Sequence, residues 1–201
     1  MKVFQFIVII SIFLFYVISC SSSAVRYTSE EIKQFPPEVQ QRIIRGEIST
    51  GMTPQQVRYA WSAPRGVQSL QGKDKKYIEQ WTYSYLGACP IELTFQDGKL
   101  QSIILSDSGR TSEIRYTQEE IKGYPENIQN HIKNGQLITG MTPHQVRNSW
   151  GGPEGVSSSK QSDGKSREEW VYASTALCKV NVIFIDGKLA GLIRAEGIGS
   201  Q

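Results

Sequence analysis

The chain has 201 residues, of which 39% are hydrophobic and 20% are charged, and its formal net charge is +3. This charge is weak and the lysines and arginines form no cluster, so the composition argues against nucleic acid as a partner. Without an N-terminal signal about 180 residues remain, which is enough for one large domain or two small ones.

The first predicted element is a secretory signal. Lys2 precedes an almost continuous apolar run over residues 3–18, and small residues follow the run. This order is typical of a signal peptide. The run leads into Cys20 through Val-Ile-Ser, which resembles the lipobox of a bacterial lipoprotein. By that resemblance residues 1–19 are the signal peptide and Cys20 is lipidated. The alternative is an uncleaved anchor helix, since the run is nearly long enough to span a bilayer.

Both alternatives place the rest of the chain outside the cytoplasm, on a membrane surface. The lipobox resemblance implies acyl chains such as palmitate on Cys20, and more than one chain makes membrane anchoring stable. Residues 20–25 then form a lipid-anchored tether. Ser21 stands where an acidic residue is linked to inner-membrane retention. In a diderm source this favours the outer membrane, with the protein facing the periplasm.

Three helices are predicted next. Thr28 starts a capping-box pattern and therefore a short helix, which the two prolines after Phe35 end. Apolar residues spaced for one face predict a second helix over residues 38–45. Thr53 is a good N-cap and a proline follows it, so a third helix begins there and runs to about Trp61.

After the helices the hydrophobic pattern changes to strict alternation, which indicates β-strands. Alternation predicts strands at residues 81–85 and 91–95, a two-residue turn at Asp97-Gly98 and a return strand over residues 100–105. The segment 68–77 is expected to be a solvated hairpin connection. Its lysines are candidates for binding a partner: Lys73, Lys75 and Lys76.

The same pattern then recurs, because residues 26–104 match residues 115–193 without a gap, 89 positions later. Such a duplication indicates two copies of one structural module. The predicted organisation is a first module, a linker, a second module and a tail, over residues 26–105, 106–114, 115–195 and 196–201.

The predicted fold class is α+β. Each copy has the pattern of helix, helix and an antiparallel meander of three or four strands, in two layers with one sheet face against the helices. A module of about 80 residues has a marginal core, so the two copies are expected to dock. Residues 157–167 repeat the solvated connection of the first copy.

The two copies differ on one strand face. In the first copy this face carries polar residues: Thr82, Ser84, Thr94 and Gln96. At the same positions the second copy carries apolar residues, which are candidate partner-binding residues: Val171, Ala173, Ile183 and Ile185. This face either docks on the first copy, since a small module needs extra burial, or binds an external partner. A misread strand register is the third alternative.

The repeated aromatic residues have strand spacing, which favours core packing over a groove for peptide or glycan; they are Trp81, Tyr83, Trp170 and Tyr172. Asp97 and Asp186 each precede a glycine, and turn chemistry explains both. The chain contains no nucleophile motif and no phosphate-binding glycine loop. The sequence therefore predicts no enzyme, no cofactor and no small-molecule substrate.

Cys89 and Cys178 occupy the same position in each copy. In an oxidising compartment they either form one disulfide between the copies or remain two buried thiols. A metal site is not expected, because neither His131 nor His144 has a counterpart in the first copy.

Several of these motifs together resemble a known domain family. Gly-Met-Thr-x-x-x-Val from Gly51, then Trp61 and Pro64, Trp-x-Tyr from Trp81, and a strand ending in Phe-x-Asp-Gly-Lys-Leu are similar to the SmpA/OmlA domain, the BamE-like fold. BamE is an outer-membrane lipoprotein of the β-barrel assembly machinery and has one such module. The resemblance implies a protein–protein scaffold in outer-membrane protein assembly or envelope integrity, with barrel-assembly components among its partners.

The tandem arrangement is also similar to β-lactamase inhibitory protein, in which two related modules form one concave sheet surface. This resemblance implies the alternative function, a stand-alone protein-binding or inhibitory module. That inhibitor has a cysteine pair within each module, whereas each copy here has a single cysteine.

Overall fold

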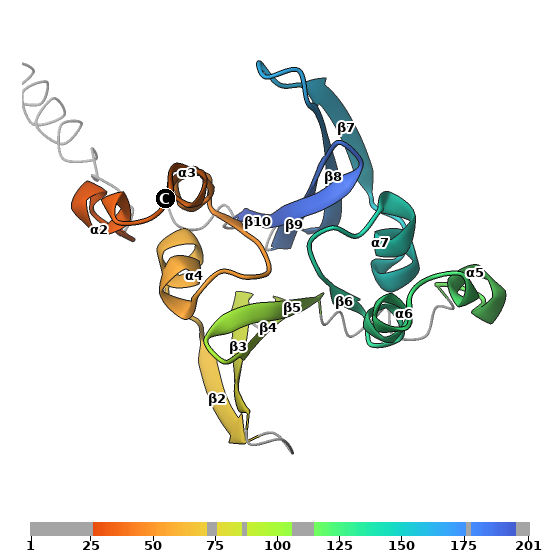
Figure 1. The fold of residues 1–201 in the computed structure, drawn as a ribbon, viewed down its shortest axis with the longest axis horizontal. Helices are drawn as coiled ribbons and strands as arrows, with labels where there is room; N and C mark the ends of the chain where they lie inside the picture. The colour runs from red at the N-terminus through yellow and green to blue at the C-terminus, as the bar shows by residue number, and fades with distance from the viewer. Residues whose placement is uncertain (1–25, 72–75, 86–87, 106–114, 176–177, 196–201) are drawn as a thin grey trace, which may run out of the picture.

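The computed structural model describes residues 26–71, 76–85, 88–105, 115–175 and 178–195 (Figure 1). The predicted signal with Cys20, the lysines Lys73 and Lys75, the linker and the tail lie outside the described residues. So do the side chains of Cys89, Ala173 and Cys178. Within the described part of the chain, no helix has both the length and the apolar character needed to cross a membrane.

Each copy contributes three helices, and the predicted caps are confirmed. Thr28 and Thr53 each accept a hydrogen bond from a backbone N–H three residues later and form a full capping box, as do their counterparts in the second copy. The helices are α2 (Ser29–Lys33), α3 (Pro37–Ile44), α4 (Pro54–Trp61), α5 (Gln118–Lys122), α6 (Glu126–Lys133) and α7 (Pro143–Trp150).

Each copy also contributes an antiparallel meander of four strands, which confirms the α+β class. The strands are β2 (Gly66–Gln71), β3 (Tyr77–Tyr85), β4 (Ala88–Gln96), β5 (Lys99–Leu105), β7 (Gly155–Lys160), β8 (Ser166–Thr175), β9 (Cys178–Ile185) and β10 (Lys188–Ala195). The two Asp-Gly turns are also confirmed. Asp97 and Gly98 have φ of 51° and 73°, and Asp186 has φ of 48°, as a two-residue hairpin turn requires.

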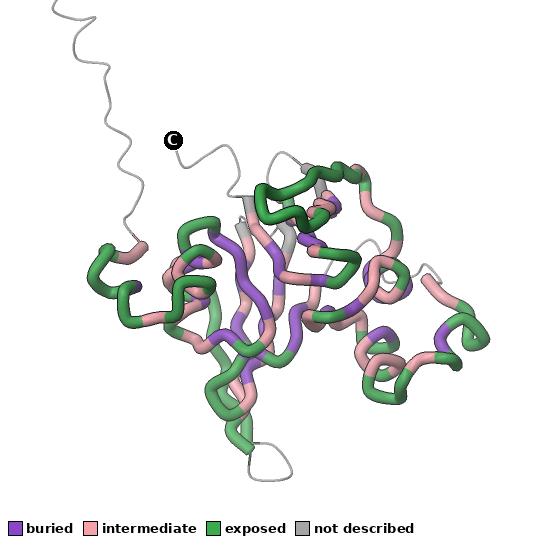
Figure 2. The backbone as a smooth tube through the Cα atoms, turned by 45° about the horizontal axis from the view of Figure 1, so that its top comes forward, coloured by how far each residue is buried: buried purple, intermediate pink, exposed green. Residues whose placement is uncertain are grey.

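The prediction that residues 68–77 and 157–167 are loop connections is partly wrong. Most of the first half of each segment belongs to an outer strand, β2 or β7. All six residues of β2 are exposed, as Figure 2 shows for the hairpin that projects from the body. A strand with no buried face has no alternating apolar pattern, so its sequence is not distinguishable from that of a polar loop.

Two short strands join the copies in a way that the sequence did not predict. β1 (Glu47–Ile48) from the first copy pairs with β10 of the second, and β6 (Gln136–Leu137) from the second copy pairs with β5 of the first. The result is two separate five-stranded sheets, in the orders β1-β10-β9-β8-β7 and β2-β3-β4-β5-β6. Each copy therefore adds one short strand to the sheet of the other, and the two four-stranded meanders stay in separate sheets.

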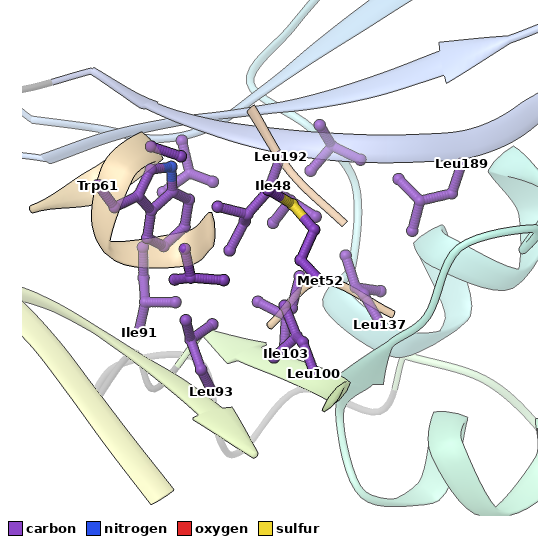
Figure 3. Packing of buried hydrophobic residues seen from close by; sticks show 14 of the residues in the cluster. Ile48, Met52, Trp61, Ile91, Leu93, Leu100, Ile103, Leu137, Leu189 and Leu192 are labelled. Atoms are coloured by element: carbon purple, nitrogen blue, oxygen red, sulfur yellow. The ribbon is translucent and has the colours of Figure 1, made fainter. Parts of the chain in front are cut away.

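The two copies contact each other at a pair of equivalent residues between the exchanged strands and the helices that follow them. The hydroxyls of Thr50 and Thr139, which are 89 positions apart, form a hydrogen bond. The Thr139 backbone N–H also donates to the Thr50 hydroxyl at 3.2 Å. A local two-fold axis that relates the two copies therefore passes close to this contact. Around it the apolar side chains of both copies meet in one core (Figure 3), including Ile48, Met52, Leu100, Ile103, Leu137, Leu189 and Leu192.

The repeated aromatic residues lie in the core, as predicted. The side chains of Trp81, Tyr83, Trp170 and Tyr172 are all at most 4% exposed. Trp61 packs edge-on against Tyr83, with ring centroids 5.4 Å apart, and its indole N–H donates to the Gly46 carbonyl at 2.8 Å. Buried indole N–H groups need such a partner. These residues hold the helices on the inner face of each sheet and leave the other face outward.

Candidate functional site

The apolar face predicted for the second copy is the outer face of its sheet. Cross-strand partners project to the same side of a sheet, and Ile183 pairs with both Gly191 and Glu169. Ile183 is buried but does not belong to the apolar core cluster. We define the outer face by Glu47, Glu169, Val171, Asn181, Ile183, Ile185 and Ile193, which alternate with core residues along their strands.

The outer face is partly accessible. Val171, Ile185 and Ile193 are half-buried, whereas Ile183 is only 1% exposed. At the equivalent positions the first copy carries Thr82, Gln96 and Ile104, all half-buried. The contrast in polarity between the two sheets is therefore real at the positions equivalent to Val171 and Ile185, and these apolar side chains are available for contact.

The first copy reaches one edge of this face. A Cβ atom built on Gly191 would lie 2.8 Å from Cγ of Glu47, so the Glu47 side chain lies directly over Gly191. Gly191 is the strand partner of Ile183. One edge of the outer face is thus covered by a side chain from the other copy, while Val171 lies on β8, two strands away from β10.

A charged cluster fixes that edge. The Glu47 side chain is 3% exposed and forms ion pairs with Arg42 and with Arg45, the latter at 3.1 Å. Arg42 also donates to the carbonyl of Ala190 at 2.9 Å, at a bulge in β10. A buried carboxylate needs such partners because leaving it unpaired is costly. The cluster therefore fastens the exchanged strand of the first copy to the sheet of the second.

Polar groups near the middle of the outer face are incompletely satisfied. The Asn181 side-chain amide donates to the Glu169 carboxylate, which also pairs with Arg167 at 3.3 Å. The side-chain oxygen of Asn181 is buried and has no hydrogen-bond partner among the described residues. Buried acceptors normally have a partner, and because this oxygen is buried a bound protein could reach it only if neighbouring side chains moved.

The projecting hairpin of the first copy is the second surface that the sequence proposed. Lys76 is exposed and directly precedes its return strand, β3. The lysine prediction missed three apolar neighbours, Val67, Leu70 and Tyr77, each about half exposed. They are single apolar residues separated by polar ones, so the sequence alone did not predict that they are exposed.

The two histidines have ordinary hydrogen-bonding roles. His144 Nδ1 contacts the Tyr124 hydroxyl at 2.6 Å, and His131 Nδ1 contacts the side-chain oxygen of Gln136 at 2.8 Å. Partial burial, with the nearby Glu120 carboxylate, raises the pKa of Tyr124. Within the described ranges, no three His, Cys, Asp or Glu side chains come together as a metal site would need.

Comparison with known proteins identifies no family for this chain. No protein-family model matches the chain. No curated protein matches it either. One similar solved structure is that of a candidate β-lactamase inhibitor protein from Streptococcus mutans, with 15% identity and a TM-score of 0.29, covering 72% of this chain and 83% of that one. The SmpA/OmlA resemblance therefore rests on the sequence motifs alone.

Proposed function

We propose that the chain is a lipoprotein of the cell envelope that is anchored to the outer membrane through Cys20 and works by binding another protein. In this proposal it is a scaffold in outer-membrane protein assembly or envelope integrity. The lipobox-like N-terminus supports the anchor. The observation that carries protein binding is the outer face of the second sheet, where Val171, Ile185 and Ile193 remain partly exposed.

The chemistry of this face fits a protein partner. Three partly exposed aliphatic side chains lie on it: Val171 and Ile193 are the cross-strand partners of Asn181, and Ile185 lies four residues further along the same strand. Covering the exposed remainder of each aliphatic side chain would contribute about 1 kcal/mol at about 25 cal/mol per Å². Protein interfaces commonly combine apolar contacts with polar groups around them, and here the partly exposed Arg167 and Glu169 lie beside the aliphatic side chains.

The test is a pull-down of the tagged full-length protein from membranes in mild detergent. The variant Val171→Ser/Ile185→Ser changes only half-buried positions and should fold like the wild type. The matched control is Thr82→Ser/Gln96→Ser, which alters the same positions of the first copy. Capture of barrel-assembly or other envelope proteins by the wild type and the control, with loss in the apolar-face variant, supports the proposal.

Two other outcomes would reject it. Equal recovery with all three proteins would show that the outer face does not bind the partner. Capture of a soluble enzyme in the absence of detergent, with inhibition of that enzyme, would establish the inhibitory alternative in place of the scaffold.

A further inference from the structure

A groove of about 500 Å³ opens beside the contact between Thr50 and Thr139, where the two copies meet. Its floor contains the buried Leu100 and the half-buried Ile138. The other side chains and backbone that line it are those of Thr50, Gly51, Lys99, Gln101, His131 and Thr139. The groove lies apart from the outer face, so it is independent of the binding surface proposed above.

The local two-fold relation explains why this groove is open. The residue equivalent to His131 is Arg42, and the residue equivalent to Gln101 is Ala190. On that side the Arg42 guanidinium extends to the Ala190 carbonyl at 2.9 Å and to Glu47, so it fills the space. His131 is shorter and contacts the Gln136 side chain instead, which leaves the corresponding space unfilled.

The same comparison gives the charge of the groove. The charged cluster of the first copy, Arg42, Arg45 and Glu47, is replaced in the second copy by His131, Asn134 and Gln136. No acidic residue is among those that line the groove, whereas Lys99 is. Within the described ranges no salt bridge includes Lys99. The groove thus offers an ammonium group and the Gln101 side chain beside an aliphatic floor.

We propose that this groove binds an acidic peptide segment, with a side-chain carboxylate at Lys99 and its aliphatic stem over Ile138. An incoming arginine, which would imitate Arg42, is disfavoured because the carboxylate of Glu47 has no counterpart here: Gln136 occupies that position. A carboxylate gains a charge-assisted hydrogen bond from the ammonium group, and this geometry suits glutamate because its stem covers the apolar floor.

The probe is the acetylated and amidated peptide Ala-Glu-Glu-Ala, titrated into isotope-labelled full-length protein in detergent micelles. Saturable changes in the amide NMR signals of Gly51, Gln101 and Thr139 are expected. The uncharged peptide Ala-Gln-Gln-Ala should leave them unchanged. Lys99→Gln should weaken binding about fivefold, the factor for an exposed ion pair of about 1 kcal/mol. The matched control Lys188→Gln, at the equivalent place beside Arg42, should bind like the wild type.

Three results would overturn the proposal. One is the absence of saturable changes at millimolar peptide. Another is an equal response to the glutamine peptide, which would show that the carboxylate is not recognised. The third is an equal weakening by Lys188→Gln, which would show a general charge effect. Both lysines are exposed, so the unchanged remainder of each spectrum will confirm that the variants are folded.

Discussion

Replacement of Gly191 by alanine tests the exchange of strands between the copies. The added Cβ atom would lie 2.6 Å from the Ile48 carbonyl oxygen and 2.8 Å from Cγ and Oε1 of Glu47. Contacts this short do not persist, so β1 must move away from β10. The displaced groups include a backbone carbonyl, which cannot relieve the contact by changing a side-chain rotamer. Overpacking of this kind typically costs about 1–3 kcal/mol.

For Gly191→Ala we expect a loss of about 2–3 kcal/mol, because the shift of β1 also disturbs the ion pairs of Glu47. In a chain of this size this corresponds to a fall in melting temperature of about 4–12 °C. The measurement is urea unfolding monitored by tryptophan fluorescence. Both copies are expected to unfold together in a single transition. The matched control is Ser102→Ala, because Ser102 occupies the equivalent position and already carries a Cβ atom.

The reasoning would be refuted by a Gly191→Ala protein as stable as the wild type. It would also be refuted by a Ser102→Ala protein that loses as much stability, since that control introduces no new atom. Unfolding of Gly191→Ala in two steps, with only the second copy affected, would show that the exchanged strand does not couple the copies.

Three further predictions concern single groups. Ser62 has φ of 69°, where the second copy has Gly151 at 84°, so Ser62→Gly should raise the free energy of unfolding by about 1 kcal/mol in urea titrations. Glu47→Gln should lower it by about 2–3 kcal/mol, because Arg42 and Arg45 lose a buried anion; unchanged stability would contradict this. Hydrogen bonds from Thr28 lower the pKa of Glu31, so a carbon-13 NMR titration should find that carboxyl below the ordinary glutamate range. Its capping contribution is then present above the unfolded-state pKa and is lost as pH falls through the lowered folded-state value.

The sequence predicted the elements that local interactions determine. Thr28 and Thr53 cap helices through residues only three positions away, and Asp97-Gly98 turns a hairpin by itself. The strands β1 and β6 were not predicted, because two residues carry no periodicity and their partners lie more than 100 and about 30 positions away, respectively. Strand pairing between distant segments is decided by tertiary packing.

The candidate site was predicted in the same partial way. Alternation correctly placed Val171 and Ile185 on the face opposite the core. The near-complete burial of Ile183 was not predictable, because the Glu47 side chain beside it comes from the other copy. The groove at Lys99 was missed because its lining residues come from four segments, and the comparison of Arg42 with His131 has meaning only once the copies are placed about Thr50 and Thr139.

The central claim is that the outer face of the second sheet binds another envelope protein. The most direct test is photo-crosslinking in living cells, with a photoreactive amino acid at position 171 in one strain and at position 82 in another. Both positions are half-buried and equivalent in the two copies. The account predicts a discrete crosslinked protein from position 171 and none from position 82. Crosslinks from position 82 alone, or from neither position, would contradict it.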